Sequence, residues 1–287
     1  MFADVWFRGN VTYPCSTTAI GRKLEDNVRM RIFQKCLQFF TGNLLISGAA
    51  DDTGGWAGYW NAPTIWSDSA LWNRQMQVLL ELIEPFVKFG AADRVLDFGC
   101  GSGFFAAQMQ GQVKEIVCAD LSQHSVELCQ QKFAGRRDVS IVKLTGDLAQ
   151  IAALGPDCTK TLCLSVIQYF PTLAYLDEFI AAVGKISVRG GVLILVDVGR
   201  AERTWRERLL TVLFTLRHGM FWQVVAKLAQ MQFSDAAYQA VLGRAGHLEI
   251  PEQYFESAQQ RLGVKVTKIP RQLTLNANRK SYIIEFV

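Results

Sequence analysis

The segment Val95-Leu-Asp-Phe-Gly-Cys-Gly-Ser-Gly103 decides the fold. Residues 94–98, with Val95, Leu96 and Phe98, predict a strand, and the run that starts at Phe104 predicts a helix. Between them, the glycines at 99, 101 and 103 carry no β-carbon, so a ligand can approach the backbone closely. Free N–H groups at the start of the helix add polar contacts for that ligand. Such a turn serves either a dinucleotide or an adenosyl ligand.

Three features of the sequence separate these two ligands. The third glycine follows the second by two residues, and the bulky Phe104 stands where a dinucleotide turn needs a small residue for close packing. Asp97 precedes the first glycine, where a carboxylate repels a pyrophosphate but can hold the ammonium of an amino acid. Asp120 ends the next predicted strand and can accept both hydroxyls of a ribose, as it could for NAD. The first two features favour S-adenosylmethionine (SAM).

From position 93 onward, short β-branched runs alternate with helical stretches, which predicts a parallel sheet with helices on both faces. The expected strands are residues 94–98, 115–119, 139–144, 161–167 and 192–198, and the expected helices are 104–110, 122–133 and 173–186. The fifth strand is apolar on both faces and should be central. The tail predicts a helix at 251–262 and a hairpin of strands 264–273 and 282–287, with the last strand antiparallel to its neighbours.

Two regions lie outside this alternation. Residues 1–90 are expected to form a helical N-terminal extension, with helices at 24–40 and 69–86 and a loop rich in Gly and Asp at 48–58. Residues 91–287 would form the SAM-binding domain, with a helical insertion at 200–245. The insertion carries apolar residues at helical spacing, namely Trp205, Leu209, Val212, Leu213 and Leu216, then Met220, Phe221, Trp222, Val225 and Leu228.

This insertion predicts a lid over a partly apolar acceptor. Between positions 200 and 244 there are seven basic and three acidic residues, which favours an acceptor with phosphate or carboxylate groups. There are two alternatives to a lid. The insertion could be a packed pair of helices, or it could form a surface that docks on a partner or contacts a membrane peripherally.

These residues resemble the class I SAM-dependent methyltransferases. Residues 95–103 are similar to the first motif of that family. Asp120 and Leu121 match the acidic position after its second strand, and Thr145-Gly-Asp-Leu148 is similar to the segment that meets the adenine. The resemblance covers residues 79–198 and 264–287. It implies a Rossmann-like class I methyltransferase fold, a seven-stranded, mostly parallel sheet with a reversed last strand. It also implies SAM as methyl donor and S-adenosylhomocysteine as product.

The resemblance implies a set of cofactor-binding residues: Asp97, Phe98, Gly99, Cys100, Gly101, Gly103, Asp120, Leu121, Asp147, Leu148, Ser165, Gln168, Tyr59 and Trp60. Asp147 is equally explained as a helix N-cap. Residues 165–171 resemble the segment beside the transferable methyl in N-methyltransferase domains of nonribosomal peptide synthetases. A loop with Tyr59, Trp60 and Trp66 is expected either to close over SAM or to pack in the core.

Methyl transfer needs little covalent help from the protein, because positioning supplies much of the rate. A general base is required only when the acceptor keeps its proton until attack. The candidate catalytic residues are Tyr169, His247 and Asp197, with His218 as a further candidate base. Asp197 is also suited to hydrogen-bonding a loop.

Composition limits the function classes. The chain has 287 residues, 50% hydrophobic and 20% charged, which is typical of a globular protein. Its longest apolar runs are too short to span a membrane, and the N-terminus lacks signal-peptide features, so a cytoplasmic protein is expected. Seven cysteines without a C-x-x-C pair and three scattered histidines predict no metal site.

The sequence thus predicts a SAM-dependent methyltransferase that modifies an oxygen or nitrogen of a small molecule, such as a natural product or biosynthetic intermediate. No nucleic acid is expected, because the net charge is only +4 and the motif that holds a flipped base is absent. Alternatives are a sugar or lipid-linked glycan precursor as acceptor, a non-catalytic SAM-fold scaffold, and a dehydrogenase. The sequence leaves the acceptor and the oligomeric state open.

Overall fold

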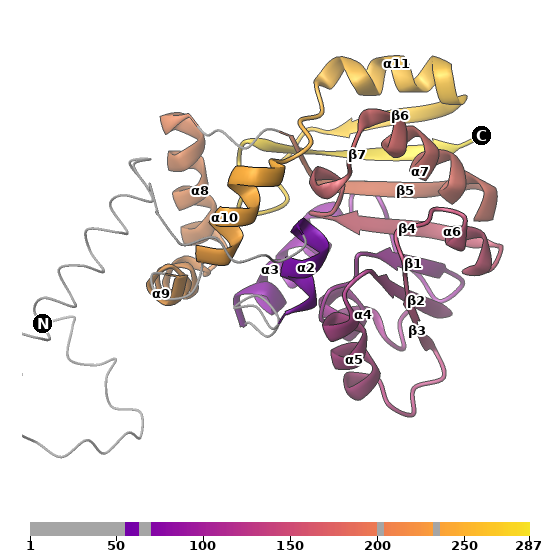
Figure 1. Ribbon diagram of the computed structural model, residues 1–287, viewed down its shortest axis with the longest axis horizontal. Coiled ribbons are helices and arrows are strands. Elements are labelled where there is room, and N and C mark those ends of the chain that lie inside the picture. The colour runs from indigo at the N-terminus through magenta and orange to yellow at the C-terminus, as the bar shows by residue number, and fades with distance from the viewer. Residues whose placement is uncertain (1–54, 63–69, 200–203, 232–235) are drawn as a thin grey trace, which may run out of the picture.

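One mixed sheet organises the part of the chain that the computed structural model describes, residues 55–62, 70–199, 204–231 and 236–287. The predicted helix at 24–40 and Trp66 lie outside these ranges. The strand order is β3-β2-β1-β4-β5-β7-β6 (Figure 1). The strands are β1 (Arg94–Phe98), β2 (Glu115–Asp120), β3 (Val139–Lys143), β4 (Cys158–Leu164), β5 (Ser187–Gly199), β6 (Val264–Ile269) and β7 (Arg279–Phe286).

Neighbouring strands from β3 to β5 pair in parallel, whereas β7 pairs antiparallel with both β5 and β6. This arrangement confirms the predicted Rossmann-like sheet with its reversed last strand, and β5 is central as expected. In a parallel sheet the carboxyl ends of the strands meet at one edge, where ligands bind. That edge is formed here by the turns that follow β1, β2 and β4.

The helices alternate with the strands and cover the sheet. They are α2 (Gly55–Asn61), α3 (Ala70–Ile83), α4 (Phe104–Met109), α5 (Gln123–Lys132), α6 (Gln150–Ala153), the short 3-10 helix η1 (Ile167–Tyr169), α7 (Leu173–Ile186), α8 (Trp205–Arg217), α9 (Phe221–Met231), α10 (Ala236–Ala245) and α11 (Glu252–Leu262). Figure 1 shows α2, α8, α9 and α10 gathered on one side, beyond the sheet. The sequence predicted α7 and β1 with their observed bounds.

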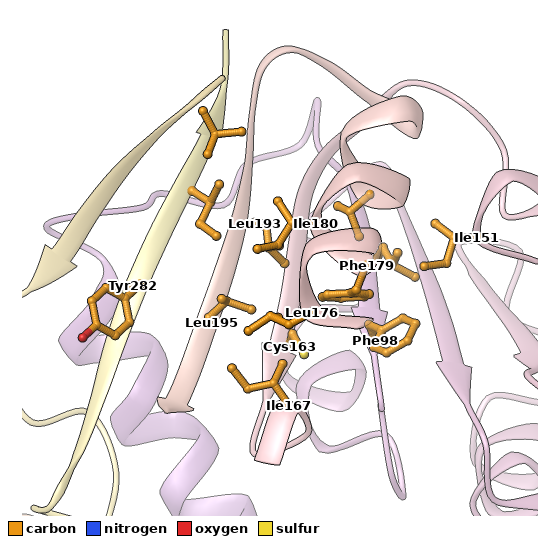
Figure 2. Packing of buried hydrophobic residues seen from close by; sticks show 14 of the residues in the cluster. Phe98, Ile151, Cys163, Ile167, Leu176, Phe179, Ile180, Leu193, Leu195 and Tyr282 are labelled. Atoms are coloured by element: carbon orange, nitrogen blue, oxygen red, sulfur yellow. The ribbon is translucent and has the colours of Figure 1, made fainter. Parts of the chain in front are cut away.

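Two buried clusters lie on the two faces of the sheet, because side chains alternate along each strand. Leu193 and Leu195 of β5 pack on one face with α7 and α11, whereas Ile194 and Val196 pack on the other with α3, α4 and α5. Figure 2 shows the first cluster, in which Phe98 and Phe179 lie with ring centroids 4.6 Å apart. Helix α3, which the sequence placed in the extension, is therefore one of the helices that cover the sheet.

Several predicted element bounds were wrong for identifiable reasons. Strand β4 ends at Leu164, three residues early, because Ser165 has a φ of 56° and η1 follows it. Strand β5 begins at Ser187 rather than at residue 192, and its register against β4 shifts between Ser187 and Val192. Strand β6 ends at Ile269 because Pro270 has no N–H to donate to a ladder.

The described helices include no single one that is long and apolar enough to cross a membrane. The segments Trp205–Arg217 and Phe221–Lys227 reach that length and composition only together, and a bend of 118° separates them.

Thr204 begins α8 with a capping box, in which its hydroxyl accepts from the N–H of Glu207 and the Glu207 carboxylate accepts from the N–H of Thr204.

Asp197 ties three parts of the chain together at the end of β5. Its carboxylate accepts hydrogen bonds from the Ser165 hydroxyl at 2.7 Å, the Asn276 amide at 2.8 Å and the Thr274 hydroxyl. The side chain is 4% exposed, and φ is 69°, a left-handed conformation that is rare for a residue other than glycine. With both oxygens engaged, this carboxylate anchors the loop between β6 and β7 against the end of β4.

Gln75 of α3 holds the same loop from the other side. Its amide donates to the Leu273 carbonyl at 3.1 Å and accepts from the Leu275 N–H at 3.0 Å. The loop is therefore fixed by polar contacts that come from helix α3 and from strand β5.

Replacing Asp197 by Ala should lower the free energy of unfolding by about 3–5 kcal/mol, because buried donors lose their charged acceptor. Urea denaturation followed by circular dichroism measures this loss. A variant that keeps full stability but loses methyl transfer would instead identify Asp197 as a catalytic group.

Candidate cofactor site

The three glycines of the turn after β1 have different roles, although all have positive φ. A β-carbon at Gly99 would overlap the Val166 side chain, and one at Gly103 would lie 2.6 Å from Phe133. A β-carbon at Gly101 would meet nothing within 4 Å. Gly99 and Gly103 therefore permit close packing within the protein, whereas Gly101 faces open space in which a ligand can lie.

Asp120, at the end of β2, shapes this turn. Its two carboxylate oxygens accept from the N–H of Gly101 at 2.8 Å and from the N–H of Ser122 at 2.7 Å. Burial raises the pKa of Asp120, and these two hydrogen bonds oppose that rise. The carboxylate thus lies beside the open space at Gly101, on the side of the sheet edge where a ribose was predicted.

Asp97 lies beneath the turn and is 4% exposed. Its Oδ2 has no hydrogen-bond partner in the part of the chain that the structure describes. Burial raises the pKa of Asp97 well above its usual range, and the neighbouring Cys129 and Asp120 add to the rise. An unpaired buried carboxyl oxygen is costly, so its presence indicates a missing cationic or hydrogen-bond-donating partner.

Helix α2 lies over the turn and is anchored at both of its ends. The Trp60 carbonyl accepts from the Ser122 hydroxyl at 2.6 Å, and the Asn61 side chain accepts from the Gln123 N–H at 2.7 Å. At its other end the Trp56 indole donates to the Gly246 carbonyl at 2.9 Å. The helix therefore connects the start of α5 with the segment that follows α10, and Figure 1 shows α2 beside α10.

An aromatic cluster lies where α2 meets the end of β4. Its members are Trp56, Tyr59, Trp60, Tyr169 and His247. The Trp56 ring lies 4.7 Å from Tyr169 and stacks on His247 at 5.1 Å, and Tyr169 lies 5.4 Å from His247. Trp60 meets Tyr169 edge to face at 5.7 Å. This cluster forms an apolar wall that can exclude water from the site.

The segment after β4 brings further polar groups to this wall. The Gln168 amide donates to the Ser165 carbonyl at 2.9 Å, and its backbone carbonyl accepts from the Leu248 N–H at 2.8 Å. Within the described residues, Gln168 Oε1 and the Trp60 indole nitrogen are buried without a hydrogen-bond partner. With Asp97 Oδ2, they make three buried polar atoms without a hydrogen-bond partner, and all three belong to the elements that surround the turn.

The residues predicted near the adenine lie at the ends of β2 and β3. Leu121 is 38% exposed and faces Gly146, and Leu148 is half-buried against the core. Asp147 is exposed and accepts from the Ala149 N–H at 2.9 Å, so it forms a local turn. Its contact with an adenine remains a prediction.

Other predicted residues occupy different places. The Phe98 side chain points into the core, so only its backbone belongs to the turn (Figure 2). The Cys100 side chain is buried as well. The Asp197 carboxylate is held by its three donors and is poorly suited to act as a base. His218 caps α8 and packs on Phe214 at 4.6 Å rather than joining the aromatic cluster.

Residues 48–58 and the aromatic pair after them were expected to form a loop, whereas residues 55–61 form α2. Trp56 and Asn61, which hold this helix in place, were not among the predicted residues. A signal for them was present, because Trp56, Tyr59 and Trp60 recur at the spacing of three and four residues that marks one face of a helix.

Residues 95–191 match the family described as a methyltransferase domain. They contain the glycine turn, Asp120, Asp147 and η1, and they run from β1 into the first part of β5. This segment is about a third of the chain, and it is similar to methyltransferase domains, in line with the resemblance to class I SAM-dependent methyltransferases. The cofactor of those methyltransferases is SAM, and the open space at Gly101 with the unpaired Asp97 oxygen fits an adenosyl ligand that bears an ammonium.

Among curated proteins, the chain is 28% identical over 137 residues to chondramide synthase from Chondromyces crocatus, covering 46% of this chain and 4% of the synthase. It is 24% identical over 124 residues to a ubiquinone biosynthesis O-methyltransferase from Mesorhizobium japonicum, covering 43% of this chain and 48% of the relative. The chain thus matches only part of these relatives' length. One solved structure, N-methyltransferase NodS from Bradyrhizobium japonicum WM9 in complex with S-adenosyl-L-homocysteine, is 15% identical, with coverage of 79% and 93% and a TM-score of 0.48.

The two glycines Gly101 and Gly103 make a matched test of the turn. Both substitutions to Ala place a side chain at positive φ, which costs about 1–2 kcal/mol. Gly103→Ala should destabilise the chain further, because the new methyl overlaps Phe133. Gly101→Ala should leave the fold intact yet weaken SAM binding more than tenfold, as measured by calorimetry. Parent-like SAM affinity in Gly101→Ala would show that the turn is only structural.

Proposed function

We propose that this chain transfers a methyl group from SAM to an oxygen or nitrogen of a small-molecule acceptor. The observation that carries the proposal is the pairing of open space at Gly101 with the buried, unpartnered oxygen of Asp97. A curated relative that is an O-methyltransferase of ubiquinone biosynthesis supports an oxygen acceptor, and a match within chondramide synthase supports a role in natural-product chemistry.

The residues of the turn would hold the cofactor by complementary charge and shape. Asp97 would accept from the ammonium of the methionine part, and Asp120 from the ribose hydroxyls. Leu121 and Leu148 would line the adenine position, with Asp147 accepting from its amino group. Gln168 and Trp60 offer the remaining unsatisfied polar atoms, and the backbone of residues 98–103 and 165 lines the same edge.

When bound, SAM supplies an electrophilic methyl group carried on a sulfonium. The protein's part is to position the acceptor and to keep out water. The acceptor's lone pair forms the new bond to carbon while the carbon–sulfur electron pair returns to sulfur. If the acceptor is a hydroxyl, its proton must leave, and His247 is the base that the cluster provides, with Tyr169 beside it to orient the acceptor.

The environment of His247 sets the conditions for this role. Burial lowers the pKa of His247 to about 4, and the positive charge of Arg279 lowers it as well. The imidazole is therefore neutral at physiological pH, but the same burial makes it a weak base, so it would take the proton only after the acceptor oxygen has bonded to the methyl carbon and become strongly acidic. The Arg279 charge next to it also favours an acceptor that becomes anionic as its proton leaves.

A non-catalytic scaffold is the main alternative from another class of function. Such a protein has no physical need for a buried carboxyl oxygen without a partner, because the unfavourable burial of Asp97 would lower stability for no return. A dehydrogenase is disfavoured by the same carboxylate, which would repel a pyrophosphate. A sugar or lipid-linked glycan precursor remains an alternative acceptor, and a panel of acceptors with methyl-labelled SAM distinguishes these cases.

Replacing Asp120 by Ala should weaken SAM binding by about 1.5–3 kcal/mol, the loss expected for hydrogen bonds to a charged group. Calorimetry with SAM, S-adenosylhomocysteine and NAD measures it. The parent should bind the first two and not NAD. Binding of NAD alone would refute the proposed function, and unchanged SAM affinity in the variant would refute the role of Asp120.

His247 makes a prediction about pH that needs no acceptor. Because its pKa is lower in the folded chain than in the unfolded chain, the unfolded state binds more protons between pH 4 and the usual value near 6.5. Stability should therefore rise with pH across this window, and His247→Gln should flatten that dependence. Denaturation at several pH values and NMR titration of the imidazole test this. An imidazole that titrates near 6.5 would contradict the buried environment.

A further inference from the structure

Helix α8 has its polarity reversed relative to an ordinary surface helix. Its buried side chains include Thr211 and Thr215, each 2% exposed, whose hydroxyls donate to backbone carbonyls of the same helix. Its exposed side chains are large and apolar. Trp205 is 72% exposed, and Leu209, Leu210, Leu213 and Leu216 are each at least half exposed.

The apolar residues form a continuous stripe. At about 100° per residue, Trp205, Leu209, Leu213 and Leu216 fall within one narrow arc of α8. Phe214 points to the opposite side, where it packs with Met220, Val224 and residues of α3. The stripe therefore faces solvent. The expectation that it contacts the acceptor stays a prediction.

Arginines border the stripe on both sides. By the same helical geometry, Arg206 and Arg217 lie along one border and Arg208 along the other. The acidic residue of α8, Glu207, is engaged in the capping box with Thr204. The described part of this surface thus presents apolar side chains framed by positive charge.

A further exposed aromatic residue follows the bend between α8 and α9. Trp222, in the first turn of α9, is 66% exposed. Tryptophan at each end of a leucine surface is typical of segments that lie at the boundary between lipid and water. We name the surface formed by Trp205, Leu209, Leu213, Leu216 and Trp222 the apolar stripe.

We propose that the apolar stripe docks this enzyme on the surface of an anionic lipid bilayer. The leucines and tryptophans would enter the boundary between head groups and acyl chains, and Arg206, Arg208 and Arg217 would contact the anionic head groups. The capping box and the packing of Phe214 fix the helix, so the stripe needs no rearrangement to meet a flat surface.

Charge complementarity favours a bilayer over a second copy of this chain. A symmetric pairing of two stripes would bring the bordering arginines of one copy against those of the other, since a two-fold interface joins identical patches. The described stripe offers no unengaged acidic side chain on α8 to relieve that repulsion. An anionic bilayer provides the opposite charge along both borders.

The test is sedimentation of the full chain with vesicles of phosphatidylcholine alone or mixed with phosphatidylglycerol. The parent should bind the mixed vesicles, and added salt should weaken binding. Leu209→Gln combined with Leu213→Gln should reduce partitioning at least about tenfold, because these side chains would no longer be buried in lipid. Arg206→Glu combined with Arg208→Glu should reduce it about tenfold or more.

Matched controls separate the stripe from general surface properties. Phe86→Gln removes another exposed apolar side chain, 38% exposed, outside α8 and α9. Arg137→Glu combined with Arg189→Glu makes the same change of net charge at exposed arginines elsewhere. Both controls should bind vesicles like the parent, and circular dichroism with SAM calorimetry should show that every variant is folded.

Three results would overturn the proposal. The first is a parent that fails to bind anionic vesicles at low salt. The second is a stripe variant that binds as well as the parent or loses no more than its control. The third is a parent that does not bind vesicles but self-associates in sedimentation velocity, while the stripe variant is monomeric. That result would mean that the apolar stripe binds a second copy of the chain. None of these results bears on methyl transfer, so the proposed function is tested separately.

Discussion

The site depends on the hydrogen bonds that Gly101 and Ser122 donate to the carboxylate of Asp120. These bonds join the turn after β1 to the turn after β2, so that two adjacent strand ends hold one shape. With the turn fixed, positive φ at Gly101 leaves an open position where any other residue would place a side chain. The packing of Val166 and Phe133 against the neighbouring glycines then holds β4 and α5 close to the same turn.

Burial has opposite effects on the two titratable groups nearest the chemistry. It raises the pKa of Asp97 and lowers that of His247, because in both cases it disfavours the charged form. A cationic ligand would stabilise the Asp97 carboxylate, whereas His247 is already in the form that accepts a proton. The same apolar surroundings therefore leave the carboxyl group in need of a cationic partner and keep the imidazole neutral.

Local patterns in the sequence were sufficient for the parallel core. The bounds of β1 and α7 follow from apolar periodicity and from the turns that flank them, and Asp97 and Asp120 follow from their places at strand ends. Helix α2 could not be predicted from such patterns, because its glycines favour a loop. Its position also depends on a hydrogen bond from the Trp56 indole to the Gly246 carbonyl, far along the chain. The role of Asp197 was equally hidden, since its partners Thr274 and Asn276 lie nearly 80 residues away in sequence.

The insertion shows why periodicity alone cannot orient a helix. Apolar residues at helical spacing predicted a lid, with a packed helix pair or a docking surface as alternatives, and they did not show which face of α8 packs inward. That inward face carries threonines whose hydroxyls are satisfied within the helix. The leucines are left outside, and the unpaired oxygen of Asp97 is left inside. Each arrangement opposes the stability of the isolated chain, and natural sequences keep such conflicts mainly where function requires them. In the proposals made for these two sites, an adenosyl ligand would resolve the conflict at Asp97, and an anionic bilayer would resolve the one at the apolar stripe.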